Sequence, residues 1–466
     1  MLDGHLGEPL RAPGARSSGV HTRITAAGGA DKAGERSNGA RHIRPHPLRD
    51  ELVLEVHARP FEAMVAPERG SHLAVMNETV DEQVVLQHVA DLCQRYGKPV
   101  PPAGAKFYSQ DLGPFRLRWE QHTEFSTYTF VRHGAVREPF ADPVIGLVPS
   151  DWLDDLPGTA LAAVHFALEP KDTPERDAEA LSLLFGGNSL IGADVAGGAA
   201  CAWSDLRTHD DGFSRILVRD RSMSAMQAGR LVQRLLEINT YRLVALLSLP
   251  VAREVTPRLR YVEAELGALT AKLADEPPGQ EKALLDRLSA LASEIEKIGA
   301  MTSNRFSGTR AYHDIVQTRL TQIREQRIQG LQTFTEFLER RLLPAVNFCN
   351  ATAERLDALA ARMERVGGLV RARVEVQIEV QNRDLLHSMD RRARLQFRLQ
   401  RVVEGLSVIA ITYYLLGLVA YGLHGVEAFG LHVNTEVAVG IALPIVAALV
   451  WFIMHRARRY LSDRDE

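Results

Sequence analysis

Two apolar runs near the C-terminus constrain the fold of this chain more than any other feature. They cover residues 402–423 (VVEGLSVIAITYYLLGLVAYGL) and 437–454 (VAVGIALPIVAALVWFIM). Each is close to the roughly twenty residues that an α-helix needs to cross the hydrocarbon core of a bilayer. Each is also apolar on every face, whereas a helix at the surface of a soluble domain keeps a polar face. The sequence therefore predicts a C-terminal transmembrane hairpin; a pair of buried core helices is the alternative.

Basic residues flank the two runs at their outer ends only. The segment between the runs contains no Lys or Arg, whereas arginines cluster before the first run and after the second, at Arg391, Arg392, Arg394, Arg398, Arg401, Arg456, Arg458 and Arg459. Because Lys and Arg concentrate in the cytoplasmic flanks of membrane helices, the body of the chain and its basic tail, residues 457–466, are predicted to be cytoplasmic. The arginines are also placed to contact anionic lipid, so the bilayer is a predicted partner.

The composition of the rest of the chain indicates packed cores and a reducing compartment. Hydrophobic residues make up 45% of the chain, and the net charge of -3 gives no reason to expect nucleic acid as a partner. Three cysteines without a CxxC spacing support neither a zinc knuckle nor a disulfide framework. Residues 1–45 are rich in Gly, Ala, Arg and Ser and have no apolar run. They are predicted to form a disordered tail rather than a signal peptide.

Residues 46–220 show the mixed pattern of an α/β domain. Apolar or alternating stretches predict strands, and helical periodicity predicts two helices between them. The strands are expected at 115–119, 126–132, 160–168, 190–195 and 213–218, and the helices at 79–96 and 174–185. Together with the segments that follow, the predicted fold class is α+β with a long helical stalk and a C-terminal two-helix transmembrane hairpin.

Residues 221–401 are predicted to form the stalk. Ser222 is the expected N-cap of a helix that runs to Leu249, where Pro250 would close it. Apolar residues then recur at spacings of three and four on both sides of a Pro-Pro-Gly break at 277–279. This pattern is typical of a coiled-coil hairpin.

A long helical pattern follows from Thr309 to Arg401 and is expected to continue into the first membrane span. One apolar stripe begins at Leu331 and another at Leu356. Such stripes pack either within one chain or between subunits, so a homo-oligomer through the stalk is a candidate assembly.

The chain contains no recognisable catalytic or cofactor motif. Two Gly-rich segments, 185–188 and 196–199, match neither GxxxxGK[ST] nor GxGxxG, and they are interpreted as turns. His209, Asp210 and Asp211 are candidate ligands for a hard cation, although a DDG sequence between strands is most often a turn. His122 and Glu124 have the same parity and are interpreted as two residues on one side of a sheet. We therefore expect no enzyme, no cofactor and no assigned metal site.

A sparse polar seam marks the first membrane run. Ser407, Tyr414 and Tyr421 recur every seven residues, and the seam is completed by Thr412, Gly422 and His424. Tyrosines near a helix end are typical of the membrane interface, and Ser or Thr often bond within their own helix. The alternative is that these residues line a pore made by several copies of the helix.

Four segments carry a resemblance that covers nearly the whole chain. HPLRDELVLEVHARPFEAM, WEQHTEFSTYTFVR, LLEINTYRLVALLSLP and SVIAITYYLLGLVAYGL resemble a bacterial family of predicted membrane-anchored proteins, known as domain of unknown function 3422. The resemblance implies the bacterial inner membrane as the location, and it supplies an architecture without a mechanism.

A second resemblance lies in the architecture. A cytoplasmic α/β domain, a helical stalk and two C-terminal spans are similar to the plan of CorA-type magnesium channels, which are pentamers with a Gly-Met-Asn signature at the end of the first span. The matching place here reads Gly422-Leu423-His424. The asparagine that would hold a hydrated cation is absent, which implies an altered selectivity.

Two classes of function follow. The expected one is an integral inner-membrane protein whose cytoplasmic body acts as a scaffold or sensor. The alternative is an oligomeric ion channel or transporter, for which a divalent cation is a candidate partner.

Overall fold

The computed structural model describes residues 46–49, 52–53, 60–134, 138–275, 281–428 and 434–462. The predicted disordered tail, residues 1–45, lies outside them, as do residues 429–433 and the last four residues of the basic tail. The chain divides into two units, Met1–Pro60 and Phe61–Glu466. Every element named below belongs to the second unit.

One sheet of nine strands organises the described part of the second unit, in the order β2-β3-β4-β1-β5-β8-β7-β6-β9. All neighbouring strands are antiparallel except β5 and β8, which are parallel. The strands are β1 (Glu68–Met76), β2 (Phe107–Asp111), β3 (Arg116–Gln121), β4 (Phe125–His133), β5 (Thr159–Glu169), β6 (Ile191–Val195), β7 (Ala200–Ser204), β8 (Ser214–Asp220) and β9 (Gln326–Arg327). All five predicted strands are confirmed, with shifts of a few residues at their ends.

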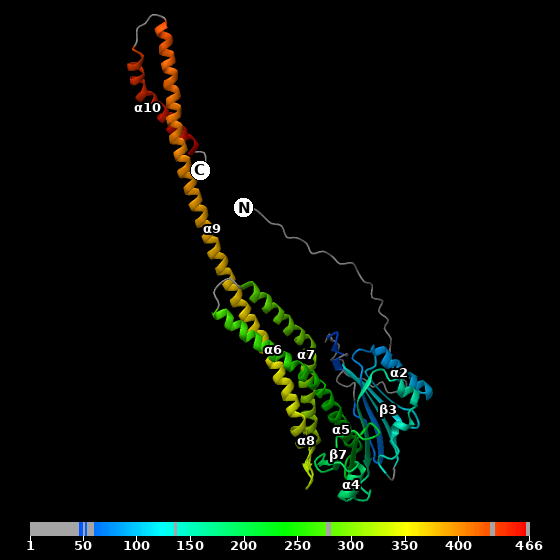
Figure 1. The fold of residues 1–466 in the computed structure, drawn as a ribbon. Helices are drawn as coiled ribbons and strands as arrows, with labels where there is room; N and C mark the ends of the chain where they lie inside the picture. The colour runs from blue at the N-terminus through cyan, green and yellow to red at the C-terminus, as the bar shows by residue number, and fades with distance from the viewer. Residues whose placement is uncertain are drawn as a thin grey trace, which may run out of the picture. The chain divides into compact units, whose positions relative to one another are not determined.

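The sheet carries helices on both faces (Figure 1). On one face, the short helices α2 (Glu82–Arg95) and α3 (Ser150–Asp154) enclose a core with β1, β3 and β4 that contains Trp119, Tyr128 and Trp152. On the other face, α5 (Ala225–Leu246) and α7 (Glu281–Ile323) share a core with β4, β5 and β8. Near β6 and β7, α4 (Ala178–Leu184) confirms the second predicted helix.

The helix that lies along the sheet, α5, starts two residues later than predicted. Ser224, not Ser222, is its N-cap, and it forms a capping box with Gln227. The helix ends at Leu246, and Pro250 lies in the first turn of α6 (Ser248–Asp275) instead of closing α5. This position is compatible with proline because the first turn of a helix needs no backbone N–H donor.

The helices α6 and α7 pack side by side with the first part of α9 (Leu343–Ala428). The leucine stripes of the predicted coiled-coil hairpin are buried in one core together with Leu356, Met363, Val366 and Val370 of α9. Packing within one chain therefore accounts for these stripes.

The predicted continuous helix from Thr309 to Arg401 is wrong in its first part. The chain leaves α7 after Ile323, pairs as β9 with β6, and forms α8 (Phe334–Arg341) before α9 begins. From Leu343 the helix then continues without a break for 86 residues, past Arg401 and through the first apolar run. The last described helix, α10 (Thr435–Ser462), is apolar and contacts α9.

Candidate functional site

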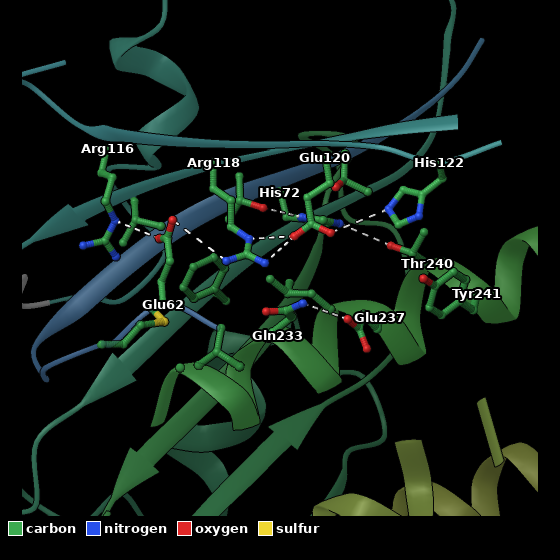
Figure 2. A pocket seen from close by; sticks show the side chains of 18 of the residues that line it. Glu62, His72, Arg116, Arg118, Glu120, His122, Gln233, Glu237, Thr240 and Tyr241 are labelled. Atoms are coloured by element: carbon green, nitrogen blue, oxygen red, sulfur yellow. Dashed lines mark hydrogen bonds and ion pairs between the residues drawn. The ribbon is translucent and has the colours of Figure 1, made fainter. Parts of the chain in front are cut away.

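Charged side chains gather on the face of β3 that is turned toward α5. Side chains alternate between the two faces of a strand, so Leu117 and Trp119 enter the core beneath α2 while Arg116, Arg118 and Glu120 lie on the opposite face. His122, just past the end of β3, continues the row. Figure 2 shows the four charged or polar side chains in line along the strand.

Ion pairs connect this row with the segment that precedes β1. Arg116 Nε lies 3.1 Å from Glu62 Oε2, and Arg118 Nη1 lies 3.9 Å from Glu62 Oε1. Arg118 Nε also donates to Glu120 Oε1 at 2.7 Å, and His122 Nε2 lies 3.8 Å from Glu120 Oε2. The side chains of Arg118 and Glu120 are each only 9% exposed, so these pairs are largely removed from solvent.

The helix α5 supplies the facing wall. Gln233, Glu237 and Tyr241 follow one another at intervals of four residues and therefore lie on one face of the helix. Gln233 Nε2 donates to Glu237 Oε1 at 2.9 Å, and Arg319 of α7 donates to Glu237 Oε2. These contacts join α5 to α7, and the same face of α5 lies opposite the charged row of β3.

Between these walls lies a cavity of about 60 Å³, which we call the β3–α5 cavity. Its polar lining comprises Glu62, His72, Arg116, Arg118, Glu120, His122, Thr127, Thr129, Gln233, Glu237, Thr240 and Tyr241. A volume of this size holds a few water molecules or a small solute. A nucleotide-sized ligand would not fit without rearrangement.

Several buried groups of the cavity lining, among them His72 and Glu237, have shifted pKa values. Burial, together with the nearby charges of His122 and Arg118, lowers the pKa of His72 to about 3, so this side chain is neutral at pH 7. Its ring nitrogens lie 2.8 Å from Thr129 Oγ1 and 3.3 Å from Thr240 Oγ1. Burial raises the pKa of Glu237, and Arg319 opposes that shift. The cavity therefore holds a neutral imidazole, His72, and one carboxyl group, Glu237, that is costly to ionise.

Gly229 of α5 sets the edge of the cavity. A Cβ atom at this position would lie 1.7 Å from the backbone oxygen of Glu62. The same segment is fixed to the start of the helix because Met64 N donates to Ala225 O at 3.0 Å. The absence of a side chain at Gly229 is therefore what lets Glu62 reach Arg116 and Arg118.

Burying this network of charged groups costs folding free energy. Each buried ion loses several kcal/mol of hydration, and well-packed apolar residues often replace buried ion pairs without loss of stability. Clusters of buried titratable groups that line a cavity are accordingly typical of functional sites. The β3–α5 cavity offers both hydrogen-bond donors and acceptors, as a binding site for a small polar solute requires.

Comparison with known proteins places the chain in a family. A family model described as "Protein of unknown function (DUF3422)" matches residues 44–461. The chain belongs to this family. No curated protein matches the sequence. The comparisons give the resemblance to CorA-type magnesium channels no support.

The candidate metal ligands of this family member do not converge. His209 Nε2 lies 3.0 Å from Asp205 Oδ2, while Asp211 Oδ1 accepts a hydrogen bond from Phe213 N and Asp210 is exposed. Within the described residues, no group of three or more His, Cys, Asp or Glu side chains could hold a metal ion. The segment 209–212 instead forms a turn, in which Gly212 N donates to His209 O.

The fold does bring together a Ser-His-Asp set that could not be predicted from the spacing of its residues. Ser71 Oγ of β1 lies 2.9 Å from His165 Nδ1 of β5, and His165 Nε2 lies 3.8 Å from Asp211 Oδ2. Ser71 is fully buried, and its Oγ also accepts a hydrogen bond from Ile145 N. Because a nucleophilic serine must be reachable by its substrate, we interpret this set as a structural polar network.

The residues of the polar seam all lie on α9. Ser407 and Thr412 donate to the carbonyl oxygens of Val403 and Val408, and His424 Nδ1 lies 2.7 Å from Ala420 O. Tyr414 and Tyr421 are exposed, as is Gly422. The basic residues Arg391, Arg392, Arg394, Arg398, Arg401 and Arg456 are exposed at the flanks of the apolar segments. Arg458 and Arg459 lie within α10.

Proposed function

We propose that this protein is a membrane-anchored sensor. In this proposal the apolar part of α9 and the helix α10 cross the inner membrane as a hairpin, and the body remains on the cytoplasmic side. The β3–α5 cavity binds a small polar solute, and the helices carry the resulting change toward the membrane.

The proposed membrane anchor is supported by apolar helical segments that the rest of the protein does not bury. Three described segments are long and apolar enough to span a membrane, within Ala225–Asp275, Phe334–Gly425 and Glu436–Arg456. In the first, 56% of the apolar window is buried, so it belongs to the protein core. In the other two, only 0% and 6% are buried. Apolar surface of that extent is costly in water and is covered if a bilayer surrounds it.

The proposed sensor role rests on one observation: a series of contacts connects the cavity to the apolar helix. Glu237 of α5 and Arg319 of α7 form an ion pair at the cavity wall. The helix α7 packs along α9, which continues as one helix from the body through its apolar segment. A solute that rearranges the ion pairs of the cavity would therefore act on helices that are rigidly connected to the anchor.

Thermal unfolding of the full chain in nanodiscs tests solute binding. Glycine, ammonium chloride and sodium acetate serve as zwitterionic, cationic and anionic probes small enough for the cavity. We expect at least one of them to raise the unfolding midpoint, because a ligand that binds only the native state stabilises it by about 2.7 kcal/mol at a hundredfold excess over Kd.

Two threonine variants make this test specific. Thr240→Val removes a hydroxyl that lines the cavity, whereas Thr318→Val removes an exposed hydroxyl of α7 that bonds within its own helix. The midpoint shift should shrink in Thr240→Val and persist in Thr318→Val. Equal shifts in both variants, or no shift with any probe, would rule out a solute site in this cavity.

The transport alternative receives less support from the geometry. Ser407, Thr412 and His424 direct polar atoms at carbonyl groups of their own helix. Side chains engaged in this way are typical of single apolar helices, so the seam itself does not favour a pore.

A further inference from the structure

A second cavity lies where α5 and α8 meet the segment that follows β7. We propose that it binds a small soluble anion that carries a phosphate or carboxylate group. The cavity has a volume of about 300 Å³ and shares no lining residue with the β3–α5 cavity. This volume is at the lower end of the range of small-molecule sites.

Three guanidinium groups from three different segments line this cavity. They belong to Arg207 after β7, Arg242 of α5 and Arg341 of α8. In the part of the chain that the structure describes, none of the three forms an ion pair with a carboxylate. Positive charge that converges on a concave surface attracts anions, and the planar guanidinium fork matches a phosphate or carboxylate.

Neutral groups hold the most deeply placed of these arginines. Arg242 Nη2 donates to Asn239 Oδ1 at 2.8 Å and to the backbone oxygen of Leu206 at 3.1 Å. Burial lowers the pKa of Arg242 to about 10, which leaves the side chain protonated at neutral pH. Hydrogen bonds to neutral groups thus position the guanidinium, and the nearby charge of Asp205 partly opposes the effect of burial on its pKa.

The carboxylate that lines the cavity, Asp205, is already engaged by other groups. Its Oδ2 accepts from Asn188 Nδ2 at 2.9 Å and lies 3.0 Å from His209 Nε2, while its Oδ1 accepts from Arg207 N. The Asp205 side chain is fully buried. The remaining charge that faces the cavity is positive.

The apolar lining points to the rest of the ligand. Leu246, Phe337 and Leu338 form part of the wall, and the Arg341 guanidinium lies 5.0 Å from the centre of the Phe337 ring. Leu206, whose carbonyl positions Arg242, has a φ of 52°. Such backbone strain in a residue other than glycine is concentrated at functional sites. The chemistry therefore suits an anionic group attached to a small apolar body.

The position of the cavity favours a soluble anion over a lipid headgroup. About 60 residues of α9 separate it from the first apolar run, and at 1.5 Å per residue they span about 90 Å. The choice of a soluble source rests on the membrane placement proposed above, whereas the anion site itself does not.

Calorimetric titration of the full chain in phosphatidylcholine nanodiscs tests the site, with phenyl phosphate and benzoate as probes and phenol as the uncharged control. We expect phenyl phosphate, benzoate or both to bind at one site, and phenol not to bind. Arg207→Gln and Arg341→Gln should each weaken the binding about tenfold, because each removes a charge-assisted contact. Both residues are exposed, so the variants should fold, and their unfolding midpoints verify this.

The matched control is Arg340→Gln, which removes a neighbouring exposed arginine of α8 that does not line the cavity. It should leave the affinity unchanged. An equal loss in Arg340→Gln and Arg341→Gln, or no binding of either anionic probe to the wild type, would overturn the proposal. If phosphatidylglycerol in the nanodisc competed with the anionic probes, the proposal of a soluble ligand would be wrong, and the site would be assigned to a lipid headgroup. None of these outcomes depends on the β3–α5 cavity.

Discussion

Gly229→Ala should destabilise the body of the protein by about 3 kcal/mol or more, at the upper end of the usual cost of overpacking a core. The added Cβ atom would lie 1.7 Å from the Glu62 backbone oxygen, and a backbone group cannot move aside as a flexible side chain can. Either α5 must move away from the sheet or the segment that carries Glu62 must leave it. The midpoint of urea unfolding, followed by the fluorescence of the buried Trp119 and Trp152, measures the effect.

Gly267→Ala in α6 is the matched control. Nothing lies within 4 Å of a Cβ atom at this position, and alanine is favoured over glycine in a helix interior by up to about 1 kcal/mol. The control should therefore be neutral or stabilising. If Gly229→Ala behaved in the same way, the close contact between α5 and Glu62 would not exist as described.

Arg118→Met should cost about 3–5 kcal/mol of unfolding free energy, as is usual when one partner of a buried ion pair is removed. The variant leaves Glu62 and Glu120 without the guanidinium that lies between them. The difference in the free energy of unfolding between the variant and the wild type, obtained from urea unfolding, measures this cost.

Arg287→Met provides the comparison for an exposed pair. Arg287 bonds Glu265 on the surface of the helical part, and its side chain is 48% exposed. Exposed pairs contribute little to stability, so this change should leave the free energy of unfolding nearly unchanged. A similar small effect for Arg118→Met would mean that the cavity network is solvated and carries no special function.

Local periodicity was sufficient to predict much of the fold. The strands β4, β5 and β8 are rich in β-branched, aromatic or other apolar residues, and the leucine stripes of α6 and α7 follow helical spacing. The central strand β1 was missed because its residues include Glu68, Arg69, Ser71 and His72. Ser71 and His72 are satisfied by partners far away in the sequence, His165 and Thr129, which only the topology brings close.

The candidate site was missed for a related reason. The alternation of Arg116, Arg118 and Glu120 is also what a solvated strand face looks like, and nothing in the local sequence shows that α5 covers it. A signal was nevertheless present in α5, where Gln233, Glu237 and Tyr241 place polar groups at intervals of four in a helix whose buried residues are mostly apolar. The polar faces of β3 and α5 could therefore have been predicted to pack against each other.

The break between α7 and α9 depends on pairing at long range. Residues 309–342 have helical periodicity, but Gln326 and Arg327 form a short strand at the edge of the sheet by pairing with β6. The Glu325 carboxylate accepts hydrogen bonds from the first amides of α8, Phe334 N and Thr335 N. Those contacts fix the start of α8, after which α9 begins at Leu343.

Cysteine labelling of the full chain in its native membrane tests the proposed anchor most directly. The native cysteines Cys93, Cys201 and Cys349 are buried, so an introduced exposed cysteine should dominate the signal. Glu436→Cys probes the start of α10, and Ser388→Cys probes α9 before the apolar run; both positions are exposed. In intact spheroplasts, a membrane-impermeant maleimide should label Glu436→Cys, whereas Ser388→Cys should react only after lysis. Labelling of both variants only after lysis, together with release of the protein by alkaline carbonate, would contradict a membrane-spanning hairpin.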